Sequence, residues 1–245
     1  GSAPSGNSAM KGKLNLQGTL NGAGFTLANM NARADVRVLP SSLGTVSVTD
    51  GRFEASLRDR RLAIAQALLR TTESTLAVSG ELGLERGTPG KLTYRFQSAD
   101  VAPWLLLVEQ KGTGSINVAG QARGNLADIE TQGAVRLANL NVAGVAAKSG
   151  DISYTLRGAA DRTLPEGVVT LRLADFDAGL VLRRLDGRAT LARMPAQSID
   201  FDFTAEDRAD RKHALKALLS FPPDGPVLRV NQLSATAPDG AWRLA

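Results

Sequence analysis

Apolar and polar residues alternate along most of this chain, from residue 10 to its end. In one typical run, Phe53, Ala55 and Leu57 are separated by charged or polar residues. Successive side chains of a β-strand point to opposite faces of the sheet, so a period of two predicts strands with one buried and one wet face. About 16 such runs occur, and together they predict an all-β protein.

Residue pairs that favour turns separate these runs and predict a largely antiparallel sheet built from neighbouring hairpins. The pairs are Asn21-Gly22, Asp50-Gly51, Arg86-Gly87, Asp186-Gly187, Asp224-Gly225 and Asp239-Gly240. At about 4.8 Å per strand, one sheet of this size would extend for roughly 75 Å, which is too long to stay flat. Because few segments favour helices that would cover an apolar face, we expect an elongated sheet that folds over on itself.

Two segments depart from the alternation. Around residues 100–109, Asp100 is placed to cap a short helix that carries Pro103 in its first turn. The second segment, residues 206–219, is rich in Ala, Lys and Leu, which favour a helix, but its latter half also alternates. We therefore expect a short helix near residues 100–109 and a strand in the latter half of the second segment.

The chain divides into a short leader and one long repetitive region. Residues 1–9 are small and polar and show no periodicity, so we expect an expression-vector remnant and linker there. Residues 10–245 are expected to form a single elongated β-groove segment of a longer protein. Within it, segments 12–22 and 114–124 form a weak repeat, with glycines at positions 1, 7 and 11 of both copies. No run of about 18 apolar residues occurs, so we expect no membrane-spanning segment.

Composition narrows the possible functions. Hydrophobic residues make up 43% of the chain but aromatic residues only 4%, so the apolar positions are almost all aliphatic. Sugars and bases stack on aromatic rings, and a carbohydrate-binding β-sandwich is therefore disfavoured. The 29 basic and 24 acidic residues occur in mixed clusters, which are typical of solvated faces rather than of a nucleic-acid interface. The absence of cysteine excludes disulfides and cysteine-ligated metals, and suits the periplasm.

No combination of residues points to catalysis, so we expect neither an enzyme, a metal site nor a cofactor. The single histidine, His213, lies near Arg211 and Lys216, and this positive environment suits neither a metal ion nor a protonated base. Asp200 and Asp202 share one strand face, but their alternation with apolar residues is better explained by a solvated outer surface.

A sheet with one apolar face must hide that face. Closure into a barrel or sandwich hides it without a ligand, whereas incomplete folding leaves a trough whose aliphatic lining needs a guest. An acyl chain is the best match, because each buried CH₂ group gains about 0.8 kcal/mol. Alternation alone leaves both architectures open, and a one-residue slip in register would exchange lining for outer shell. The expected lining residues of the trough are Leu16, Phe53, Leu57, Tyr94, Phe96, Val118, Tyr154, Leu171 and Phe203.

Several glycine-bounded strands resemble a known family. Segments 12–22, 50–57, 76–84, 114–124, 185–191 and 238–244 are similar to the G-x-L-x-L-x-G-x-L-x-G repeats of the TamB and AsmA-like family of bacterial envelope proteins. The resemblance covers nearly the whole chain. It implies a folded-over sheet groove, called a β-taco, in a periplasmic protein that is anchored in the inner membrane and bridges towards the outer membrane.

The resemblance also implies phospholipid movement between the two membranes and outer-membrane protein assembly. The family's inner-membrane helix and its region that engages an outer-membrane barrel partner have no counterpart here, so we expect an internal segment. Our leading hypothesis is a periplasmic groove that holds or conducts phospholipid acyl chains and binds no nucleic acid. The alternative is a structural or chaperone scaffold without lipid, which offers a sheet edge to outer-membrane strands by β-augmentation.

Overall fold

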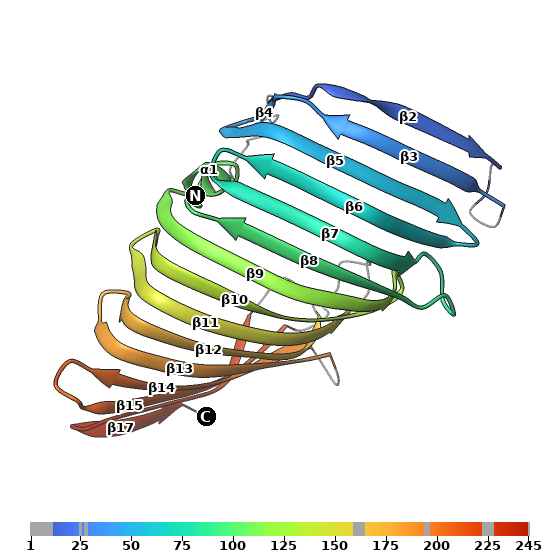
Figure 1. Ribbon diagram of the computed structural model, residues 1–245. Helices are drawn as coiled ribbons and strands as arrows, with labels where there is room; N and C mark the ends of the chain where they lie inside the picture. The colour runs from blue at the N-terminus through green and yellow to red at the C-terminus, as the bar shows by residue number, and fades with distance from the viewer. Residues whose placement is uncertain are drawn as a thin grey trace, which may run out of the picture.

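The structure is a computed structural model that describes residues 12–24, 26, 29–158, 165–193, 197–221 and 228–244. The predicted leader at residues 1–9 and the predicted turn Asp224-Gly225 lie outside these residues. Within them, the chain forms one 17-stranded sheet and one short helix (Figure 1).

The strands follow one another in chain order. They are β1 (Gly12–Lys13), β2 (Leu16–Ala23), β3 (Asn31–Val38), β4 (Ser41–Leu43), β5 (Val46–Arg58), β6 (Arg61–Thr71), β7 (Ser74–Gly83), β8 (Gly90–Ser98), β9 (Gly112–Asn125), β10 (Asp128–Val142), β11 (Val145–Gly158), β12 (Glu166–Asp177), β13 (Val181–Ala192), β14 (Gln197–Asp207), β15 (Lys212–Phe221), β16 (Arg229–Ala237) and β17 (Gly240–Leu244). The helix α1 (Ala102–Leu106) lies between β8 and β9.

From β5 to β17 each strand pairs antiparallel with the next one in the chain. At the other end, β3 and β4 both pair antiparallel with β5. Strand β2 then pairs with β3, and β1 pairs with β4. The one parallel bridge among the described strands joins Gly83 to Asn125. The prediction of an all-β, largely antiparallel sheet is confirmed.

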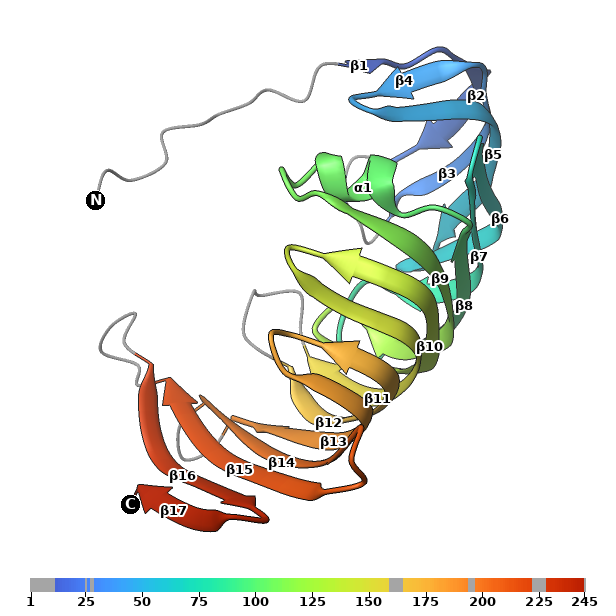
Figure 2. The same cartoon turned by 90° about the vertical axis from the view of Figure 1, so that its left-hand side faces the viewer.

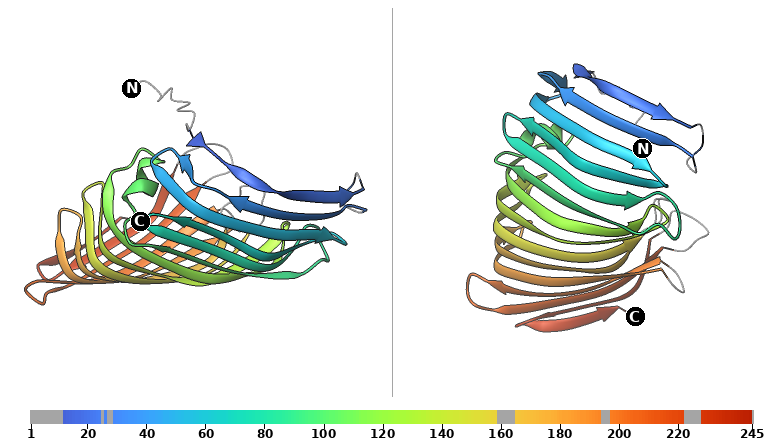
Figure 3. Two further views of the ribbon diagram at one scale, coloured as in Figure 1. Left: turned by 45° about the horizontal axis from the view of Figure 1, so that its top comes forward. Right: turned by 45° about the vertical axis from the view of Figure 1, so that its right-hand side comes forward.

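The sheet bends into an open arc, with α1 on its concave side (Figure 2). It is neither closed nor strongly curled, and the views in Figure 3 show its two end strands far apart. A closed barrel or sandwich is thus excluded for the described strands. The expected fold-over is present only as this bend. Strand twist and register shifts, such as the one between Ile64 and Ala67, are the physical sources of the curvature.

Two of the turn pairs are confirmed: Arg86-Gly87 lies in a turn, and Asp239 precedes the first residue of β17. Three others were wrong, because Asn21-Gly22, Asp50-Gly51 and Asp186-Gly187 lie inside β2, β5 and β13. At Gly187 the reason is packing, since a Cβ atom there would lie 2.2 Å from the ring of Phe203. This glycine makes room for a neighbouring side chain rather than for a tight turn.

The two departures from alternation have the expected structures. In α1, Pro103 lies in the first turn and the Asp100 carboxylate accepts a 2.9 Å hydrogen bond from the Ala102 N–H, although Val101 is the N-cap residue. The latter half of segment 206–219 forms β15, as predicted.

Candidate ligand-binding face

The strand register places apolar residues in continuous rows across the sheet. Residues directly opposite one another in antiparallel strands point to the same face. The first row contains Leu16, Val38, Gly51, Leu69, Leu76, Phe96, Val118, Val135, Ile152, Leu171, Gly187, Phe203, Leu215, Ala235 and Trp242. The second row contains Gly18, Val36, Phe53, Ala67, Val78, Tyr94, Gly120, Gly133, Tyr154, Val169, Ala189, Phe201, Ala217, Leu233 and Leu244.

Neither row contains a charged residue, and the only polar side-chain atoms in them are the hydroxyls of Tyr94 and Tyr154 and the indole nitrogen of Trp242. We call the side of the sheet that carries these rows the apolar face. Each row crosses every strand from β2 to β17 except β4, a distance of roughly 70 Å at the usual strand spacing. The sheet therefore presents an uninterrupted apolar strip.

All nine sequence-predicted lining residues lie on the apolar face. Leu16, Phe96, Val118, Leu171 and Phe203 belong to the first row, and Phe53, Tyr94 and Tyr154 to the second. Leu57 lies further along β5, opposite Ala32 and Leu62 on the same face. The structure thus brings these nine residues onto one surface.

Helix α1 shows that the apolar face is the concave one. The Trp104 ring packs edge-on against Phe96 with ring centroids 5.4 Å apart, and its Nε1 donates a 2.8 Å hydrogen bond to Ser74 Oγ. Since Phe96 lies in the first row and α1 lies inside the arc in Figure 2, the rows line the inside of the arc.

A small buried core lies beside α1, where Thr45 Oγ1 donates a 2.6 Å hydrogen bond to the Pro103 carbonyl. Val46, Val48 and Val101 are buried there, and the buried hydroxyls of Ser74 and Ser98 are 2.6 Å apart. Trp104 closes this core, as a Trp on a short helix often does. Helix α1 therefore covers only one margin of the apolar face.

Away from α1 the apolar face is largely uncovered. Phe53 in β5 and Leu215 in β15 are 36% and 39% exposed, and Trp242 in β17 is 59% exposed, whereas row residues of the central strands such as Val118 and Ile152 are half-buried. Among the described residues, only eight apolar side chains are buried. Apolar surface of this extent that no other part of the described structure covers is a candidate interaction site.

A tyrosine bridge crosses the middle of this face. Tyr94 Oη lies 2.6 Å from Tyr154 Oη and 2.6 Å from Thr131 Oγ1, although β8 and β11 are separated by two strands. The two rings reach each other because they lie over Gly120 and Gly133, where a Cβ atom would meet the tyrosine hydroxyls at 2.5 Å. Burial, followed by the hydrogen bond with Tyr94, raises the pKa of Tyr154 above its ordinary value. Tyr154 therefore stays neutral at physiological pH.

The convex face is polar and carries cross-strand ion pairs. Arg172 and Asp186 are direct register partners with Nε and Oδ1 3.0 Å apart, and Lys216 and Asp202 are partners at 2.9 Å. Asp202 therefore lies on the solvated surface that its alternation indicated. Exposed ion pairs of this kind contribute little to stability, typically about 0–1 kcal/mol each. Their charged groups keep the convex face solvated.

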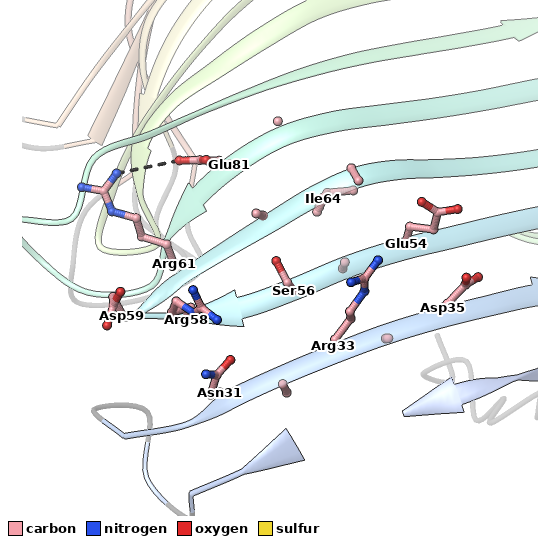
Figure 4. A pocket seen from close by; sticks show the side chains of 16 residues that line it. Asn31, Arg33, Asp35, Glu54, Ser56, Arg58, Asp59, Arg61, Ile64 and Glu81 are labelled. Carbon is pink, nitrogen blue, oxygen red and sulfur yellow. Dashed lines mark ion pairs between the residues drawn. The ribbon is translucent and has the colours of Figure 1, made fainter. Parts of the chain in front are cut away.

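A hollow of about 770 Å³ on the convex face involves β3, β5, β6 and β7 (Figure 4). Its labelled side chains mix both signs of charge, and Arg61 and Glu81 form a 3.8 Å ion pair across it. The described residues contain no group of three His, Asp or Glu side chains that could hold a metal ion. We therefore interpret this hollow as part of the solvated surface.

His213 contacts the buried carboxylate of Asp207. It lies opposite Ala205 at the end of β15, and its Nε2 is 3.2 Å from Oδ2 of the buried Asp207. Asp207 also accepts hydrogen bonds from the Ala209 and Arg211 N–H groups and from Arg211 Nε. Burial alone would raise the pKa of Asp207, but these hydrogen bonds outweigh it and hold the pKa well below its usual range.

We expect Asp207→Asn to lower the melting temperature at pH 7 and to weaken its fall between pH 7 and pH 3. The folded-state pKa of Asp207 is depressed, so its stabilising contribution is present above the unfolded value of about 4 and is lost as the pH falls towards the folded value. Asp151→Asn, which removes an exposed carboxylate of the convex face, is the control. Equal acid sensitivity of Asp207→Asn and the unmodified protein would contradict this role.

Comparisons with protein-family models, with curated proteins and with solved structures found no match to this chain. Among the described residues, no helix has the length and hydropathy that a membrane crossing requires.

Proposed function

We propose that this chain is a periplasmic segment of the TamB and AsmA-like kind, whose apolar face holds or conducts phospholipid acyl chains between the inner and outer membranes. The observation that carries this proposal is the pair of uninterrupted apolar rows on the uncovered concave side of the sheet. Such a face needs an apolar guest, and its strip shape suits a flexible chain better than a compact ligand.

The energetics favour acyl chains. Each buried CH₂ group contributes about 0.8 kcal/mol without any directional contact, so a long chain is retained yet remains free to slide along a uniform strip. Glycines and flat-lying rings make this surface smooth, as at Gly187 beneath Phe203. A sheet that folds further over its guest, in the manner of a β-taco, would cover the exposed part of the chain.

Native mass spectrometry of the purified protein, followed by lipid extraction, tests this proposal. We expect phospholipid masses to copurify, and to load again after delipidation and incubation with phospholipid vesicles. A folded, monomeric protein that stays empty after incubation would overturn the proposal.

A second candidate function rests on the two end strands. Among the described strands, β2 pairs only with β3, and β17 only with β16, so each has one edge of free backbone groups. Such edges accept another strand by β-augmentation, which would suit a chaperone scaffold for outer-membrane proteins. Cross-linking from β2 or β17 to a nascent outer-membrane barrel strand would support this function, and a lipid-loaded protein that forms no cross-link would contradict it.

A further inference from the structure

Three hydroxyl groups meet at the tyrosine bridge, in the middle of the apolar face. Tyr94 and Tyr154 are the only two tyrosines of the chain, and their hydroxyls contact each other. Thr131 Oγ1 joins them at 2.6 Å from Tyr94 Oη. We call these three residues the hydroxyl cluster. Because the tyrosine hydroxyls lie over Gly120 and Gly133, no side chain separates the cluster from the sheet at these two positions.

The surface around the hydroxyl cluster is apolar. Thr131 lies in a third row, beside the second row on the same face. From Leu20 in β2 to Val230 in β16, every other member of this third row is Ala, Gly, Leu, Ile or Val. The polar side-chain atoms of the three rows are therefore gathered in the hydroxyl cluster, apart from the indole nitrogen of Trp242 in β17.

The hydroxyl cluster has one more proton than its short contacts use. Each neutral hydroxyl carries one proton, and two of the three protons serve the 2.6 Å contacts that join Tyr154 to Tyr94 and Tyr94 to Thr131. For the third proton, Thr131 Oγ1 has the Gln121 carbonyl oxygen at 3.4 Å, which is a weak hydrogen bond. Hydroxyl groups rotate, so this chain of hydrogen bonds can reverse and place the third proton on Tyr154. All three residues are only half-buried, so this proton is available to an acceptor on a ligand.

We propose that the hydroxyl cluster donates a hydrogen bond to the ester carbonyl oxygen of an acyl chain that lies on the apolar face. In a diacyl phospholipid the ester carbonyl is the polar group next to the hydrocarbon, and it accepts hydrogen bonds but donates none. It is therefore complementary to a single spare proton surrounded by apolar rows. The cluster fixes the ester end of the bound chain at the middle strands, and the rows hold the hydrocarbon without directional contacts. This inference rests on the proposed function, since it requires an acyl lipid on the rows.

The test compares ester-linked and ether-linked phosphatidylglycerol, with the same chains and the same headgroup, in capture by the full chain from vesicles. The ether-linked lipid lacks the carbonyl oxygen. We expect the unmodified protein to prefer the ester-linked lipid by roughly two- to tenfold, the range of one neutral hydrogen bond. The triple variant Tyr94→Phe, Tyr154→Phe, Thr131→Val keeps both rings but no hydroxyl, and it should capture the two lipids equally.

The control variant Ser153→Ala, Thr170→Val removes a hydroxyl pair, 2.6 Å apart, from the convex face and should keep the preference. Equal capture of both lipids by the unmodified protein would overturn the hydroxyl site and leave the proposed function standing. An unchanged preference in a folded triple variant would do the same. Capture of neither lipid would overturn both proposals.

A second measurement needs no variant. Because the chain has no other tyrosine, the tyrosine bands in ultraviolet resonance Raman spectra report on the cluster directly. They should differ between unmodified protein loaded with the ester-linked lipid and with the ether-linked lipid, and identical bands would overturn the hydrogen bond. Competition by a free fatty acid of the same chain length, as strong as that by the ester-linked lipid, would identify a fatty-acid site and overturn the ester assignment.

Discussion

Leu171→Asp is expected to reduce phospholipid capture by roughly a hundredfold or more while β-sheet circular dichroism is retained. Leu171 lies in the first row between Ile152 and Gly187, on a stretch of the apolar face that α1 does not cover. An acyl chain laid over this position would bury an unpaired carboxylate, which costs several kcal/mol. Without lipid the same carboxylate remains partly hydrated, so the fold itself should survive.

The matched control is Thr170→Asp, which places the same carboxylate one residue away. Thr170 is opposite Ser153 and Arg188 on the convex face, where a new negative charge stays in water. This control should capture phospholipid like the unmodified protein, and Phe203→Asp should behave like Leu171→Asp. Undiminished capture by folded Leu171→Asp would show that lipid does not lie on the rows.

Gly133→Val is expected to lower the free energy of unfolding by about 2–3 kcal/mol. A Cβ atom at this position would lie 2.5 Å from Tyr154 Oη and 2.6 Å from the Ala119 carbonyl oxygen. The Tyr154 ring can rotate away from the new side chain, but it then loses its hydrogen bond with Tyr94. The Ala119 carbonyl belongs to the backbone of the neighbouring strand and cannot easily move. Valine favours strands by up to about 1 kcal/mol, which does not offset this overlap.

Urea denaturation measures the effect, and tyrosine absorbance between pH 9 and pH 12 reports the bridge itself. Gly240→Val is the control, because a side chain there would meet no atom within 4 Å. It should leave stability within about 0.5 kcal/mol of the unmodified value. Loss of the raised tyrosine pKa in Gly133→Val alone would assign the destabilisation to the bridge, and equal stability of the two variants would contradict the packing role of Gly133.

The predicted lining residues share one face because of how the sheet is connected. The pairings from β10 to β13 have no register shift, so the alternation of one of these strands stays in phase with that of the next. The repeat shows the same effect. Gly18 and Gly120 both lie in the second row, and Leu16 and Val118 both lie in the first.

Features that depend on distant segments escaped prediction. The bridge joins Tyr94 to Tyr154, and Trp104 of α1 donates a hydrogen bond to Ser74 of β7. The signal for the bridge was a glycine in each of the two intervening strands, but a glycine in a strand can equally indicate a turn or a bulge. Three turn pairs were misplaced for the same reason.

The sequence by itself determined the strands, their antiparallel order and the residues that share a face, because side-chain direction in a strand is a local property of period two. Only the tertiary structure decided which face is concave, where α1 covers it and that the sheet remains an open arc. Those features depend on twist and register shifts that accumulate over many strands, and on contacts between residues dozens of positions apart, which no local pattern encodes.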